Sequence, residues 1–207
     1  MVWPSTQKAL AVDARIVIDV NSIGQESGLY EHLVIAPYPN KYVHDWKLKN
    51  GALIQFRPIK PEDEGGFNEL FKSLSAESMR FRFFHIMKEL PHERLTRYCN
   101  LDYDREIAIV AELKSSRQLI GAGRVIAESD GKSGEFAVLV GDEWQGRGLG
   151  LKLMDYIINV AKDMRLERIF ACVLSNNYKM LRLSEKKGFK LEMLDEETVK
   201  ASLNLSD

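Results

Sequence analysis

The sequence predicts a mixed α/β domain that follows a short N-terminal extension, and two observations lead to this fold class. From Gly51 onward, apolar runs typical of strands alternate with segments of helical periodicity. A glycine-rich turn at 145–150 lies between an apolar run and a strongly periodic helix. The 207 residues, 45% hydrophobic and 29% charged, have the composition of a globular protein. We therefore expect an extension of short strands and linker over 1–48 and a main domain over 49–207.

The extension contains two Val- and Ile-rich runs, which predict strands at 9–19 and 32–36. A polar turn separates them, and Pro37 and Pro39 stop the second run. Two strands alone are only marginally stable in water. We expect a small hairpin that docks on the main domain or on a partner chain.

The first half of the main domain should begin with a strand at 52–57, which Pro58 ends. A helix follows, because Pro61 and a run of acidic residues suit the first turn of a helix. A short helix or loop over 75–84, a short helix over 92–99, and a pair of hairpin strands over 106–113 and 118–127 complete this half.

The second half contains the strand that precedes the glycine turn and the long helix that follows it. Apolar residues recur every three or four positions along this helix, from Leu149 to Met164. A strand, a short amphipathic helix with Gly188 as its C-cap, and a last strand come next, over 168–173, 177–187 and 189–194. The segment from Asp195 onward predicts no element.

The glycine turn reads Gln145-Gly146-Arg147-Gly148-Leu149-Gly150. Glycine allows backbone conformations that turn N–H groups outward, and the first N–H groups of a helix have no partner within it. This combination predicts an anion-binding turn. A Walker loop would need a lysine after its last glycine, and a dinucleotide fingerprint needs GxGxxG spacing, so neither fits. The alternative is a glycine-rich turn without a ligand.

Composition excludes several other function classes. The net charge of −1 does not favour binding to nucleic acid or to an anionic membrane. No apolar run is long enough for a membrane helix, and the N-terminus lacks a signal pattern, so we expect a cytoplasmic protein. Neither the four histidines nor Cys99 and Cys172 have metal-ligand spacing, and we expect no metal. Cys172 fits a small buried apolar residue of a strand better than a catalytic thiol.

Two motifs in this order resemble those of the GNAT N-acetyltransferase family. Gln145, Gly148 and Gly150 match its (Gln/Arg)-x-x-Gly-x-(Gly/Ala) signature for acyl-CoA, and Asn177 with Glu185-Lys186-Lys187-Gly188-Phe189 is similar to its Asn-x-x-Ala…Glu-Lys-x-Gly-Phe ending. The resemblance covers about residues 53–194. It implies a central mixed, mostly antiparallel sheet with helices on both faces, and acetyl-CoA as cosubstrate.

The resemblance also implies where the cosubstrate binds. Its pyrophosphate would lie on the N–H groups of residues 146–150, and its pantetheine arm between two diverging strands, against the backbone of Leu139 and Val140 and near Asn177. The cofactor-binding residues expected on this basis are Leu139, Val140, Gln145, Gly146, Arg147, Gly148, Leu149, Gly150 and Asn177.

Acyl transfer to an amine requires a base, because a lysine amine is protonated at neutral pH. Glu135 begins the strand beside the presumed thioester and is the expected catalytic base. Many family members use a tyrosine of the last short helix to protonate the leaving thiolate. This sequence has Ser184 at the matching position, and Tyr178 faces elsewhere on a helical wheel. We therefore expect no dedicated general acid.

Residues 75–84, Ser-Ala-Glu-Ser-Met-Arg-Phe-Arg-Phe-Phe, resemble the acceptor side of the Pat-type protein acetyltransferases within this family. That branch acetylates protein lysines, including those of acyl-CoA synthetases. Residues 11–16 look like the closing strand of an ATP-grasp domain. Most of such a domain is absent, so we expect no ATP role for Asp13 and Arg15.

The leading hypothesis is an N-acetyltransferase that moves an acetyl group from acetyl-CoA to an amine, most plausibly of a protein lysine. Two alternatives stay open: a non-catalytic acyl-CoA-binding regulator, and an acetyltransferase for small-molecule amines. The acceptor is a protein or a small molecule, with no nucleic acid or membrane as partner. A homo-oligomer is compatible with the sequence.

Overall fold

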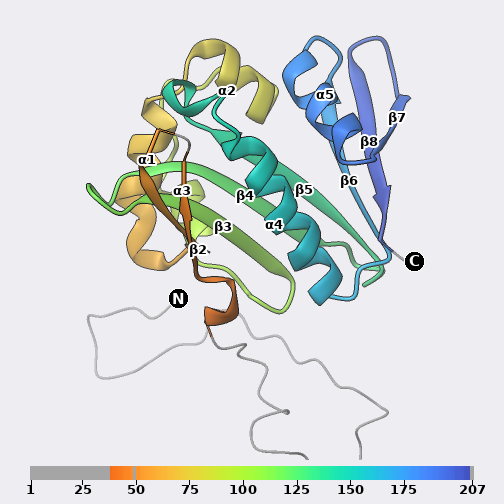
Figure 1. The fold of residues 1–207 in the computed structure, drawn as a ribbon. Helices are drawn as coiled ribbons and strands as arrows, with labels where there is room; N and C mark the ends of the chain where they lie inside the picture. Colours follow the sequence, from red (N-terminus) through yellow and green to blue (C-terminus); the bar gives the residue numbers. More distant parts are fainter. Residues whose placement is uncertain (1–37, 49, 206–207) are drawn as a thin grey trace, which may run out of the picture. The chain divides into compact units, whose positions relative to one another are not determined.

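The computed structural model describes residues 38–48 and 50–205 (Figure 1). The strands expected at 9–19 and 32–36 lie outside these ranges, as do Asp13 and Arg15, so the predicted hairpin and the ATP-grasp resemblance remain predictions. The described residues belong to one compact unit, residues 37–207.

A sheet with strand order β1-β2-β3-β4-β5-β6-β8-β7 forms the centre of this unit. Its strands are β1 (His44–Lys47), β2 (Leu53–Pro58), β3 (Glu106–Leu113), β4 (Leu119–Ala127), β5 (Ser133–Val140), β6 (Arg168–Leu174), β7 (Lys190–Met193) and β8 (Thr198–Asn204). All described neighbours pair antiparallel except β5 and β6, which are parallel. The expected mixed, mostly antiparallel sheet is confirmed.

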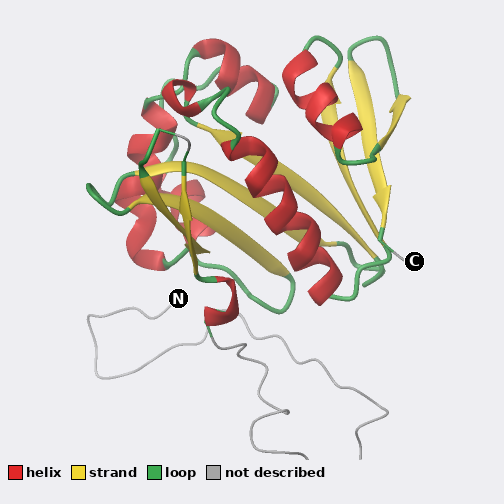
Figure 2. Cartoon of the chain, viewed as in Figure 1, coloured by secondary structure: helices red, strands yellow, loops and turns green. Residues whose placement is uncertain are grey.

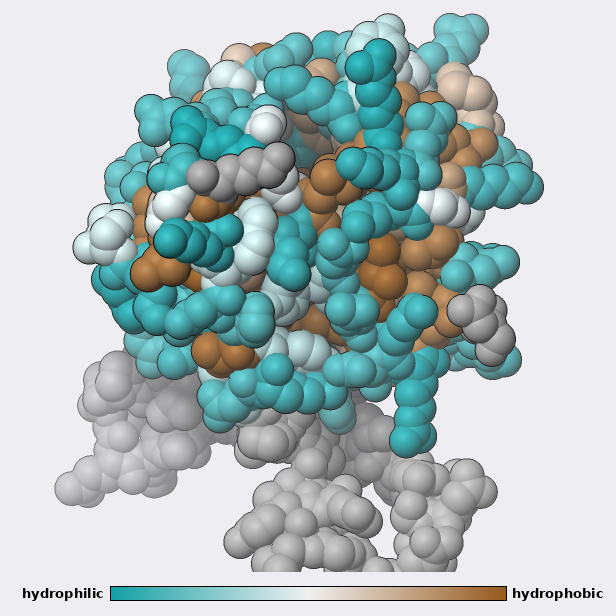
Figure 3. Space-filling model, in the orientation of Figure 1, coloured by the Kyte–Doolittle hydropathy of each residue, from teal (hydrophilic) through white to brown (hydrophobic). Residues whose placement is uncertain are grey.

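Helices cover both faces of the sheet, as Figure 2 shows. The helices are α1 (Glu64–Lys72), α2 (Ala76–Phe83), α3 (His92–Cys99), α4 (Leu149–Asp163) and α5 (Tyr178–Lys186), with 3-10 turns η2 (Asn40–Tyr42), η3 (Pro61–Asp63) and η4 (Asp142–Trp144). One apolar core joins the sheet to α4 and α5, and a second joins it to α1, α2 and α3. On the face drawn in Figure 3, apolar side chains gather beside α4.

Two strands were not among the expected elements. The first, β1, joins the sheet through a turn at Asn50-Gly51, where Gly51 has φ +90°. The sheet therefore extends into the range 1–48, which the sequence assigned to the extension. The second, β8, lies between β6 and β7, within a segment for which the sequence predicted no element. Its apolar residues Val199, Ala201 and Leu203 do alternate with polar ones.

Helix α4 lies close to β4, because that strand has glycine where the helix crosses it. A Cβ added to Gly123 would lie 2.8 Å from Ile157 Cγ1, and one added to Gly121 would lie 3.1 Å from Leu153 Cδ1. Both helix residues are fully buried. This close contact fixes the start of α4, and with it the glycine turn, relative to the sheet.

We expect Gly123→Ala to reduce the free energy of unfolding by about 1–3 kcal/mol, because the added methyl group overpacks a rigid core. Gly65→Ala is the matched control. A Cβ at Gly65 meets nothing within 4 Å, and alanine favours a helix over glycine by up to about 1 kcal/mol. Denaturant unfolding of both variants measures the difference. Equal stability of the two would contradict the close contact.

Candidate active site

Strands β5 and β6 pair over only a short stretch and then separate. Ser133, Gly134 and Glu135 pair with residues 168–170, and no pair follows. Beyond this point β5 continues beside β4 to Val140, and β6 continues beside β8 to Leu174. We call this point, after Glu135 and Phe170, the fork. Among the described strands, none pairs with one backbone edge of residues 136–140, which is where the resemblance implies a pantetheine arm.

The glycine turn presents a row of free backbone donors. Gly146 and Gly148 have φ of +72° and +89°, and α4 begins directly after them. Within the described ranges, no oxygen accepts a hydrogen bond from the N–H groups of residues 146–151. A Cβ at either glycine would meet nothing within 4 Å. Free N–H groups at the start of a long helix form a site for an anion such as a pyrophosphate.

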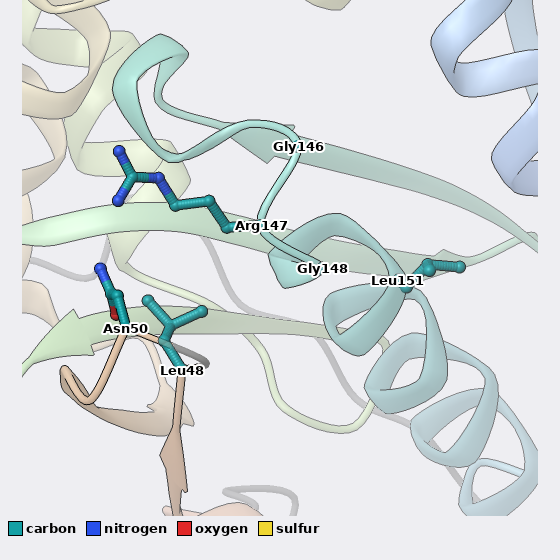
Figure 4. Close-up of a pocket in the computed structure, with 6 residues that line it drawn as sticks. All are labelled: Leu48, Asn50, Gly146, Arg147, Gly148 and Leu151. Atoms are coloured by element: carbon teal, nitrogen blue, oxygen red, sulfur yellow. The ribbon is translucent and has the colours of Figure 1, made fainter.

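A pocket of about 510 Å³ opens beside this turn (Figure 4). Its lining comes from two distant parts of the chain: Leu48 and Asn50 from the β1–β2 turn, and Gly146, Arg147, Gly148 and Leu151 from the glycine turn and α4. The exposed Arg147 guanidinium lies 5.2 Å from the centroid of the Trp144 ring. Sequence reasoning did not find Leu48 or Asn50, although Asn-Gly is a strong hairpin signal.

Gln145 holds the glycine turn to its surroundings. Its Nε2 lies within hydrogen-bond distance of three acceptors: Asp142 Oδ1 (3.0 Å), Ser78 Oγ (3.1 Å) and the Val140 carbonyl (3.3 Å). Its Oε1 accepts a hydrogen bond from Lys179 Nζ of α5 (2.9 Å). The side chain of Gln145 thus organises the turn, and its predicted contact with the cofactor remains a prediction.

Asp142 extends the same network to α2. Its Oδ2 accepts a hydrogen bond from the Ser75 backbone N–H (2.5 Å), and its Oδ1 accepts one from the Ser78 hydroxyl. Ser75 is also the N-cap of α2 and accepts from the Ser78 N–H. Two serines of the Pat-like stretch therefore dock α2 on the turn. The sequence analysis quoted both serines, but it did not identify Asp142 as their partner.

Helix α5 supplies Asn177 and Ser184. The Asn177 side chain caps the helix by accepting a hydrogen bond from the Met180 N–H (3.2 Å), so it orders the loop as expected, while its contact with a cofactor is untested. Ser184, at the position where many relatives have tyrosine, is fully buried, and its hydroxyl has no hydrogen-bond partner among the described residues. Tyr178 is 68% exposed. Ser184 is thus not placed to donate a proton into the fork.

Glu135 lies at the fork, opposite Ile126 on β4 and beside Phe170 on β6. Alternation puts it on the same face of β5 as Leu139, which packs into the core of α1, α2 and α3. Glu135 itself is exposed, as are Ile126 and Cys172. The expectation that Cys172 is buried is therefore wrong, because its side chain lies on the open face of β6. The carboxylate therefore reaches solvent on the face opposite α4, at the base of the separation between the strands.

A small pocket follows Glu135 on the same face, with room for about one water molecule (about 20 Å³). Arg82, Tyr98, Arg124 and Ala137 are among its lining residues. Arg124 is buried, forms an ion pair with Glu106, and lies 4.9 Å from the centroid of the Tyr98 ring. Burial lowers the pKa of Arg124 to about 10. This pocket brings cationic side chains close to the expected base.

Comparison with known proteins identifies the family. Residues 71–189, more than half of the chain, match the Acetyltransferase (GNAT) family. The chain belongs to this family. It is therefore an acyl-CoA-dependent N-acyltransferase that acts on an amine.

Individual relatives agree with this assignment. Over 144 residues, 69% of the chain, it is 28% identical both to the acetyltransferase PA5475 of Pseudomonas aeruginosa and to the acetyltransferase Pat of Mycolicibacterium smegmatis. The match covers 77% of the first relative but only 43% of the second. The GNAT domain of S. lividans PAT superposes with a TM-score of 0.76 at 25% identity, over 81% of this chain and 99% of that domain.

A further neighbour shows that this fold binds the expected cosubstrate. The acetyltransferase YncA of Salmonella typhimurium, solved with acetyl-CoA, has a TM-score of 0.62 at 19% identity, over 74% of this chain and 95% of its own.

Among the described residues, no group of three or more His, Cys, Asp or Glu side chains is placed to hold a metal ion. None of the helices within 38–48 and 50–205 combines the length and apolar character that a bilayer crossing requires.

We expect Gly148→Trp to raise the Kd for coenzyme A at least about a hundredfold, because a bulky side chain would block the approach of phosphate to the free N–H groups. Gly131→Trp is the control. Gly131 also has a positive φ (+65°) and open space around it, but it lies in the β4–β5 turn. Titration calorimetry measures both affinities. Unchanged binding by Gly148→Trp would show that the pyrophosphate lies elsewhere.

Proposed function

We propose that the protein transfers an acetyl group from acetyl-CoA to a lysine side chain of a protein. The observation that carries this proposal is the position of Glu135, an exposed carboxylate at the fork, on the face opposite α4. The similarity to Pat and to the GNAT domain of S. lividans PAT supports a protein acceptor. The Pat-like stretch at 75–84, which forms α2 on this face, supports it further.

In this proposal the cosubstrate binds in two parts. The pyrophosphate is held by the N–H groups of Gly146, Arg147, Gly148, Leu149 and Gly150, with added charge from Arg147. The pantetheine arm follows the open edge of β5 at Leu139 and Val140, and passes near Asn177. When bound, acetyl-CoA supplies an activated acyl group as a thioester. Gln145 acts by holding the turn in shape through its hydrogen bonds to Asp142 and Ser78.

Glu135 prepares the acceptor. A lysine ammonium has a pKa near 10.4 in water and cannot attack until it loses a proton. The Glu135 carboxylate accepts that proton, directly or through a water molecule, at the point where β5 and β6 separate. Alignment of the amine beside the thioester supplies much of the rate enhancement.

The leaving thiolate takes its proton from solvent in this proposal. Ser184 is fully buried, and Tyr178 projects into solvent. A thiol with an ordinary pKa near 8.5 is a good leaving group at neutral pH, so a dedicated acid is less necessary here than for an alkoxide.

We expect Glu135→Gln to lower kcat by about a hundredfold or more, the usual loss when a general base is removed, with little change in the Kd for coenzyme A. Glu185→Gln, a change of an exposed glutamate on α5, is the control and should retain wild-type kcat. Steady-state assays from pH 6 to 9 measure both. An unchanged kcat in Glu135→Gln would contradict the assigned role.

The acceptor can be sought with labelled acetyl-CoA in a cell lysate, followed by mass spectrometry of the labelled proteins. Labelled lysines, including those of acyl-CoA synthetases, would support the proposal, which also places the reaction in the cytoplasm. Turnover with polyamines or amino acids but with no protein would replace it with a small-molecule acetyltransferase. Binding of acetyl-CoA without turnover would contradict a catalytic role.

A further inference from the structure

The face that carries Glu135 also carries positive charges that the proposed reaction does not use. Arg82 at the end of α2 and Arg124 on β4 line one small pocket with Tyr98. Arg97 of α3 lies near enough for its charge, with that of Arg82, to disfavour the protonated form of Arg124. Among the described residues, Glu106 forms an ion pair with Arg124 but not with Arg82 or Arg97. We refer to Arg82, Arg97 and Arg124 as the cationic cluster.

Arg82 forms no ion pair with any residue that the structure describes. Its guanidinium is partly buried and lies 5.0 Å from the centroid of the Phe83 ring. In the described part of the chain it forms no ion pair and no side-chain hydrogen bond. Burial lowers the pKa of Arg82, and the negative charge of the nearby Glu135 carboxylate opposes that change. Removing a guanidinium from water without a partner is costly, and a bound anion would recover that cost.

The position of the Arg82 guanidinium relative to Glu135 indicates that the bound anion is part of the acceptor. Ala137 lines the pocket with Arg82, and Glu135 lies two residues earlier on the same face of β5. Two residues of a strand span about 7 Å. If the acceptor amine is held at Glu135, a group that lies next to this amine in the acceptor can therefore reach the cationic cluster.

We propose that Arg82, supported by Arg124, binds a carboxylate that the acceptor carries close to its reactive amine. Guanidinium matches carboxylate in shape and charge and pairs with it through two parallel hydrogen bonds. This inference rests on the proposed function and specifies its acceptor. The carboxylate comes from an acidic residue that flanks the target lysine. The same chemistry is offered by the α-carboxylate of a free amino acid, and the experiment separates these two sources.

The test compares isosteric acceptors with the wild-type protein. Each of two capped peptides contains a single lysine. Glutamate flanks the lysine in one peptide, and glutamine flanks it in the other. We expect kcat/KM to be about tenfold or more higher for the glutamate peptide, the value of a charge-assisted pair. Free lysine and lysinamide form the second arm. If the protein prefers free lysine over lysinamide but does not prefer the glutamate peptide, the α-carboxylate is the source of the bound anion. No preference in either arm would overturn the inference.

Variants of α2 then test the residue. Arg82→Gln should reduce the ratio of kcat/KM for the glutamate peptide to that for the glutamine peptide to near one. Its activity on the glutamine peptide should stay within about twofold of wild type. Arg82→Lys should keep part of the preference for the glutamate peptide. Arg80→Gln is the matched control, because Arg80 is exposed on the same helix. The Kd for coenzyme A confirms that each variant is folded. An unchanged preference in Arg82→Gln would overturn the assignment to Arg82.

Failure of the inference and failure of the proposed function give different results. Equal acetylation of the two peptides leaves the protein lysine acetyltransferase in place and removes only the carboxylate site. Acetylation of neither peptide and of no protein, with coenzyme A binding intact, overturns the proposed function and the inference together.

Discussion

The loss of pairing between β5 and β6 after Glu135 and Phe170 is the constraint on which the rest of the site depends. If β5 and β6 stayed paired along their length, the backbone N–H and C=O groups on that edge of residues 136–140 would be hydrogen-bonded to β6. Because they separate, that edge is free beside the glycine turn, and the carboxylate at the last paired position reaches solvent. A single change in strand pairing thus creates both the open edge along which we propose that an extended ligand binds and the exposed carboxylate that we propose as the base.

Hydrogen bonds around Gln145 join the parts that must act together. Through Asp142 and Ser78 they connect the turn to α2, and through Lys179 they connect it to α5 on the other side of the fork. Helix α2 carries Arg82 at its opposite end. One short helix, α2, therefore contacts both the glycine turn, where we propose that the pyrophosphate binds, and the small pocket at Arg82, which we assign to the acceptor. A shift of α2 would move parts of both sites.

Local patterns predicted much of this protein. Helical periodicity identified α4, apolar runs identified the main strands, and glycine spacing identified the turn, because each depends on a few neighbouring residues. Contacts between distant segments could not be predicted in the same way. The approach of Asn50 to the turn, and the cluster around Arg82, depend on how separate elements pack. The strand β8 was overlooked despite its alternation, because a polar stretch from Asp195 precedes it.

The insertion of β8 between β6 and β7 has a consequence for synthesis on the ribosome. Strands β1 to β5 each pair with the next strand in the chain, so they can assemble as they emerge. The strand β6 has only the short pairing with β5 until residues 198–204 have been translated. The nascent chain therefore carries an open strand edge that can recruit other chains. The wall of the fork formed by β6 is completed last, and chaperone contact should concentrate on that interval.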